Sequence, residues 1–60
     1  KSTIIRGYRE DIMEDRCDLN ALQQIRNNIE TDDRLSERDA NGLLAVINQL
    51  IDDSWSRIFG

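Results

Sequence analysis

Carboxylate side chains gather in the first half of the chain, where they could attract a hard cation such as calcium. They are Asp11, Glu14, Asp15 and Asp18, and a chain folded back on itself would bring Asp52 and Asp53 near them. Calcium-binding loops also need a central glycine at a fixed spacing, which this segment lacks. We therefore expect a solvated acidic face and no metal site.

A second group of polar side chains could bind a partner. At about 100° per residue along one continuous helix, one side carries a strip that contains no carboxylate. The strip consists of Arg6, Arg9, Arg16, Asn20, Gln23 and Asn27. Such side chains hydrogen-bond to phosphates or base edges, and equally to an acidic protein surface. The alternative is a solvated face with helical ion pairs, such as Glu10 with Arg6.

Catalytic and cofactor motifs are missing from the sequence. There is no histidine, so the commonest general base and nitrogen metal ligand are absent. The single cysteine, Cys17, cannot build a thiolate zinc site, and we expect it to be a small core or boundary side chain. Neither a phosphate-binding glycine loop nor a nucleophile elbow occurs. We expect a protein that is not an enzyme and binds no cofactor.

Composition and charge narrow the class of protein. With 38% hydrophobic and 33% charged residues, the 60-residue chain has the composition of one folded domain. The net charge of -4 disfavours a protein whose whole surface attracts nucleic acid. No apolar run approaches the ~20 residues that cross a bilayer, so we expect a cytoplasmic protein without membrane contact.

The elements that must position these residues are helices. Apolar side chains that fit a heptad spacing predict a first helix over about 3–30, starting near Ser2 or Thr3, within a left-handed, shallow-crossing bundle. They are Ile5, Tyr8, Ile12, Leu19, Leu22 and Ile29. Asp15 and Arg26 also fall on this seam, and we expect their charged ends to reach the solvent.

A polar turn over about 31–35 precedes a second predicted helix over about 36–58. Ser36 is its expected N-cap, with Glu37 and Asp39 in the first turn. Its apolar face is wider than one helix pair requires, which predicts more than one neighbour. The expected core residues are Leu43, Leu44, Ile47, Leu50, Ile51, Trp55 and Ile58. Gly42 weakens this helix unless another backbone or a large side chain packs closely there.

Two antiparallel helices joined by this turn would place Tyr8 beside Phe59 and Ile12 beside Trp55, at the end remote from the turn. The predicted fold is thus an all-α helical hairpin. Because so short a hairpin cannot enclose a core, we expect two copies to dimerise into a four-helix bundle. The alternative is a three-helix bundle, in which the first helix breaks within residues 14–18 and Asp18 caps a new helix.

These observations favour a small protein-protein interaction module that acts as a homodimer and regulates a larger protein partner. The alternative function is a nucleic-acid-binding regulator that uses the Arg/Asn/Gln strip of the first helix.

Overall fold

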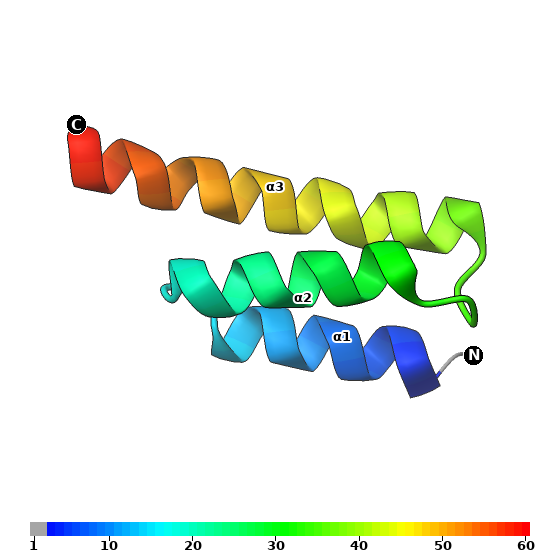
Figure 1. Cartoon of the computed structure of the whole chain (residues 1–60). Helices are drawn as coiled ribbons and strands as arrows, with labels where there is room; N and C mark the ends of the chain where they lie inside the picture. The colour runs from blue at the N-terminus through cyan, green and yellow to red at the C-terminus, as the bar shows by residue number, and fades with distance from the viewer. Residues whose placement is uncertain (1–2) are drawn as a thin grey trace.

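Three α-helices make up the described part of the chain, residues 3–60 of a computed structural model (Figure 1). They are α1 (Thr3–Glu14), α2 (Leu19–Thr31) and α3 (Glu37–Phe59). α2 runs antiparallel to both α1 and α3, which therefore run in the same direction (Figure 1). The prediction of an all-α protein is confirmed, and residues 3–60 contain no strand. Ser2, one predicted start of the first helix, lies outside the described residues.

The prediction of one continuous helix over 3–30 was wrong, and the three-helix alternative is what the structure shows. α1 ends at Glu14, and the Asp18 amide donates to the Asp15 carbonyl at 2.8 Å. The Asp18 carboxylate then accepts from the Ala21 amide at 3.2 Å and caps α2. This local turn and cap satisfy amides that a helix start leaves unpaired. With three helices in each copy, a dimer cannot be the predicted four-helix bundle.

The break also overturns the predicted placement of Tyr8 beside Phe59 and of Ile12 beside Trp55, which would have brought the three aromatic side chains to the end remote from the turn. The chain reverses direction between α1 and α2. The start of α1 and the connection between α2 and α3 therefore lie at the same end of the molecule (Figure 1). There the Tyr8 hydroxyl donates to the Asp32 carboxylate at 2.7 Å. Trp55 and Phe59 lie together near the end of α3, where their rings stack with centroids 5.2 Å apart. The three aromatic side chains therefore do not gather at one end.

The start of α3 agrees closely with its prediction. The Ser36 hydroxyl accepts from the Asp39 amide at 3.2 Å, so Ser36 is the N-cap. Glu37 and Asp39 lie in the first turn, where carboxylates favour the positive end of the helix dipole. The helix covers residues 37–59, one residue later at each end than predicted.

One apolar core joins the three helices. Its buried members are Ile12, Leu22, Ile25, Ile29, Leu43, Ile47 and Ile51. Partly buried hydrophobic side chains pack around them, namely Ile5, Tyr8, Leu19, Leu35, Ala40, Leu44 and Leu50. Trp55 and Ile58, both expected in the core, are exposed. Their exposure follows from their position near the end of α3.

The length of α3 explains this exposure. At about 1.5 Å per residue, the 23 residues of α3 extend roughly 34 Å, while the whole molecule is 37 Å long. α1 and α2 have 12 and 13 residues and are little more than half as long. The last turns of α3 therefore project beyond the other two helices (Figure 1).

Candidate protein-interaction surfaces

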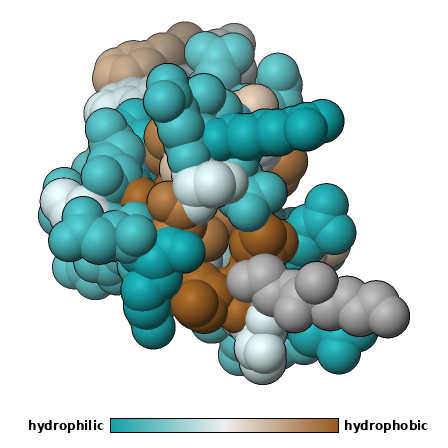
Figure 2. All heavy atoms as spheres, turned by 90° about the vertical axis from the view of Figure 1, so that its right-hand side faces the viewer, coloured by the Kyte–Doolittle hydropathy of each residue, from teal (hydrophilic) through white to brown (hydrophobic). Residues whose placement is uncertain are grey.

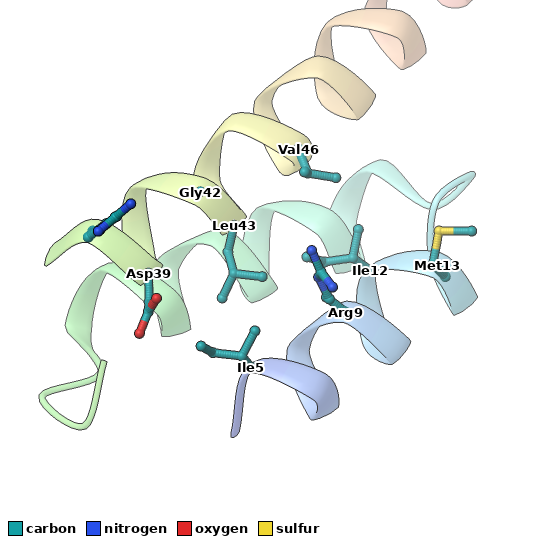
Figure 3. Close-up of a pocket in the computed structure, with 9 residues that line it drawn as sticks. Ile5, Arg9, Ile12, Met13, Asp39, Gly42, Leu43 and Val46 are labelled. Atoms are coloured by element: carbon teal, nitrogen blue, oxygen red, sulfur yellow. The ribbon is translucent and has the colours of Figure 1, made fainter. Parts of the chain in front are cut away.

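An open apolar groove lies between α1 and the first half of α3, with a cavity volume of about 420 Å³. We call it the α1–α3 groove. Its lining is Ile5, Arg9, Ile12, Met13, Arg38, Asp39, Gly42, Leu43 and Val46. Figure 3 shows Ile5, Ile12 and Leu43 pointing into the space between the two helices. Met13 and Val46 border this space and remain 58% and 49% exposed.

Hydrophobic surface also reaches the end of the molecule where α2 joins α3. Figure 2 views this end and shows hydrophobic side chains in its centre, between hydrophilic ones. A monomeric protein normally surrounds its apolar interior with polar side chains, so an apolar surface left open is a candidate contact site.

A second apolar surface lies at the other end of the molecule. Trp55, Ile58 and Phe59 are 41%, 61% and 78% exposed, and we call them the C-terminal apolar tip. The Trp55 and Phe59 rings are nearly parallel, with an interplanar angle of 9°. Large aromatic side chains that stay in water are typical anchors of protein interfaces.

The predicted basic strip is not one continuous helical face. Arg6 and Arg9 lie on α1 and Arg16 lies in the turn after it, while the remaining members lie on α2, which runs in the opposite direction. These α2 members are Asn20, Gln23 and Asn27. Gln23 is partly buried, whereas the other five are exposed. Of the six, Arg9 alone is part of the groove lining.

The carboxylates of the first half of the chain are likewise separated by the break. Asp11 and Glu14 lie on α1, Asp15 lies in the turn, and Asp18 is occupied as the α2 cap. Within residues 3–60, no group of three or more Asp, Glu, Cys or His side chains is arranged to hold a metal ion. Cys17 is exposed in the turn, not at the core boundary where it was expected.

The two charged seam residues differ in their contacts. Arg26 is partly buried, donates to the Asn48 side chain at 3.5 Å and lies 3.9 Å from the Glu30 carboxylate. Its charged end thus stays at the edge of the α2–α3 contact. Asp15, in the turn, is also partly buried.

A polar cluster that sequence reasoning missed closes the end of the bundle near the α2–α3 connection. The Asp32 carboxylate accepts from the Tyr8 hydroxyl at 2.7 Å and from the Arg34 guanidinium at 2.7 and 2.9 Å. The Arg34 amide adds a fourth hydrogen bond at 2.9 Å. The Asp32 side chain is only 7% exposed, whereas that of Arg34 is 66% exposed. The cluster therefore ties α1 to the connection.

Ionisation of the cluster follows from these contacts. Hydrogen bonds from Arg34, and then from Tyr8, hold the pKa of the Asp32 carboxyl well below its usual value. The same bond to Asp32 raises the pKa of the Tyr8 hydroxyl, and Asp32 raises the pKa of the Arg34 guanidinium. These shifts favour an ionised Asp32 and a protonated Tyr8, the charge states in which the hydrogen bonds between α1 and the connection form.

Ile25 is a core residue that the heptad pattern missed. It is 8% exposed and lies between Leu22 and Ile29 on the buried face of α2. A helix that starts at Leu19 with a period of 3.6 residues puts Leu22, Ile25 and Ile29 on one face. The signal was therefore present in the sequence, and it was missed because the heptad period of 3.5 residues places Leu22 and Ile29 on the seam and leaves Ile25 beside it.

Comparison of the chain with protein-family models, with curated proteins and with solved structures gave no match. None of the helices formed by residues 3–60 combines the length and the hydrophobicity that crossing a membrane requires.

Proposed function

We propose that this chain is a non-enzymatic protein-interaction module that self-associates and presents apolar surfaces to a protein partner. The observation that carries the proposal is the exposure of five large hydrophobic side chains on a 60-residue chain. They are Met13, Val46, Trp55, Ile58 and Phe59. They form two separate surfaces, the α1–α3 groove and the C-terminal apolar tip.

A packed core supports this proposal, because the exposed residues are not needed to complete it. Leu22 and Ile47 are completely buried within the single chain. The fold can therefore expose apolar surface and still enclose a core, and self-association adds contacts at the surface. Large exposed hydrophobic side chains favour association with other proteins.

Sedimentation equilibrium over a range from low micromolar to several hundred micromolar tests the proposal. We expect the mean mass to rise with concentration from that of one chain to at least that of two. Changing both Met13 and Val46 to Gln should weaken the association, while Asn20→Gln, at an exposed polar position, should leave it unchanged. A single-chain mass over the whole range would contradict self-association.

Nucleic-acid binding remains the alternative, although the strip on which it was based is divided between two helices and a turn. It predicts binding of RNA or DNA that weakens steeply with salt, because Arg contacts to phosphates release counterions. Titration of RNA and of DNA with the wild type and with the Arg9→Gln, Arg16→Gln double variant, each at two salt concentrations, distinguishes the alternatives. Salt-sensitive binding that the double substitution weakens would favour nucleic acid over a protein partner.

A further inference from the structure

We propose that the α1–α3 groove binds the C-terminal apolar tip of a second copy of this chain. The proposal rests on the self-association proposed above and names the two surfaces that meet. Within one copy they cannot meet, because α3 is a continuous helix that begins at the groove and carries the tip at its other end.

Gly42 shows that the groove can receive a large side chain from outside. A glycine inside a helix destabilises it by roughly 1 kcal/mol relative to alanine. No contact within residues 3–60 accounts for Gly42, since a Cβ atom built on it would meet nothing there within 4 Å. The missing side chain instead leaves open a groove whose lining includes Ile5 and Val46. A bulky residue of another copy, such as Trp55 or Phe59, suits this space.

The charges at the two surfaces are complementary. Arg9 and Arg38 line the groove, and neither has an ion-pair partner among residues 3–60. Positions three and seven residues apart lie on one face of a helix, so Asp52 shares a face with Trp55 and Phe59. The arriving helix would bring a carboxylate one turn away from its aromatic anchors. Asp39 also lies in the groove, and the two arginines outnumber it.

The lengths of the two surfaces also match. From Ile5 to Met13 the groove follows α1 for about 12 Å, at the helical rise of 1.5 Å per residue. From Asp52 to Phe59 the docking segment is about 10 Å long by the same rise. An exposed helix with apolar anchors at this spacing fits the mode in which an amphipathic helix binds in an apolar groove.

Two single substitutions disable one surface each and spare the fold. Gly42→Leu fills the groove from inside, and the open space around Gly42 accepts the new side chain. Phe59→Lys removes an aromatic ring that is 78% exposed and repels Arg9 and Arg38. The matched controls are Ala45→Leu and Asn41→Lys, at exposed positions of α3 outside both surfaces. Circular dichroism should show a thermal midpoint no lower than that of the wild type for Gly42→Leu.

Sedimentation equilibrium of each variant and of their mixture tests the proposal. Each surface variant alone should associate at least tenfold more weakly than the wild type, while both controls should associate normally. An equimolar mixture should form pairs of one chain of each kind, because Phe59→Lys keeps an intact groove and Gly42→Leu keeps an intact tip. Raising the salt concentration should weaken these pairs.

Three results would overturn the proposal. If the mixture stays monomeric while the wild type associates, the groove does not bind the tip, although self-association through other surfaces stands. If Gly42→Leu or Phe59→Lys alone associates as strongly as the wild type, the groove likewise does not bind the tip. A wild type that is monomeric throughout the concentration range would overturn both this proposal and the self-association on which it rests.

Discussion

Among single residues, Asp32 has the densest set of polar contacts in the described chain. It ends α2, yet its carboxylate binds Tyr8 of α1 and Arg34 of the following turn. A carboxyl group whose pKa is lowered by folding stabilises the protein fully above its unfolded pKa, near 4. The stabilisation by Asp32 starts to fall at about pH 5, as the carboxyl group of the unfolded chain begins to take up protons. It continues to fall until the pH reaches the lower pKa of the folded state.

Asp32→Asn should therefore make the stability of the protein depend less on pH below about pH 5. In urea unfolding between pH 7 and pH 2, the midpoint of the wild type should fall more than that of the variant, so their difference narrows with acid. Asp33→Asn is the matched control, because Asp33 is exposed and adjacent. A variant whose midpoint stays parallel to that of the wild type down to pH 2 would show that Asp32 is not tied in the folded state.

Ser54 is the buried polar residue of α3. It is 7% exposed, and its hydroxyl oxygen has no hydrogen-bond partner within residues 3–60. A buried polar group without a partner costs about 1–3 kcal/mol of stability. Ser54→Ala should thus raise the free energy of unfolding by about 1 kcal/mol, and Ser56→Ala, at an exposed position, should change it little. A loss of stability in Ser54→Ala would reveal a partner for the hydroxyl.

The sequence allowed residue roles to be predicted where they depend on near neighbours. Ser36 caps an amide three residues later, so its role follows from local geometry. Tyr8 binds a carboxylate 24 residues away, and this contact depends on where α1 is placed. No local pattern carries that information, and the role of Tyr8 was accordingly missed.

Helix boundaries were harder to predict than helices. Ile12 and Leu19 are seven residues apart, which fits one heptad seam and also fits two separate helices that reach the same core. The spacing of these two side chains does not distinguish the cases, since both cases turn Ile12 and Leu19 towards the core. The distinction came from polar residues, because Asp18 supplies the cap that starts α2.

The break between α1 and α2 should depend on this cap. Asp18→Ala removes the hydrogen bond to the Ala21 amide, and loss of an N-cap costs about 1 kcal/mol. Chemical denaturation should show that loss, while Asp18→Asn, which can still accept the hydrogen bond, should keep most of the stability. An unchanged unfolding midpoint in Asp18→Ala would mean that the turn is held by other contacts.

In the packed molecule, neighbouring side chains of α3 differ strongly in how far they are buried. Ile47 is completely buried, whereas Val46 beside it is 49% exposed at the groove. Ile47→Ala should lower the free energy of unfolding by about 2–5 kcal/mol through lost burial and a cavity. Val46→Ala should cost less than about 1 kcal/mol, because its side chain already contacts water. Equal losses in urea denaturation would mean that the two side chains are equally buried.

The candidate interaction surfaces arise only at this scale, which is why the sequence did not predict them. The groove exists because the break between α1 and α2 lets α1 pack against α3, and the tip exists because α3 is longer than the other two helices. The apolar excess of the second helix did predict more than one neighbour, and α3 does contact both α1 and α2.

Because α1 is short, the wall of the groove that it forms depends on its packing against the other two helices. An isolated helix of 12 residues is marginal in water, so α1 should melt whenever it leaves the other two helices. The groove then exists only while α1 is docked, and a molecule bound in it holds α1 in place. Amide hydrogen exchange in α1 should therefore slow as protein concentration rises, while the central turns of α3 change less. Exchange that is independent of concentration would show that self-association leaves α1 untouched.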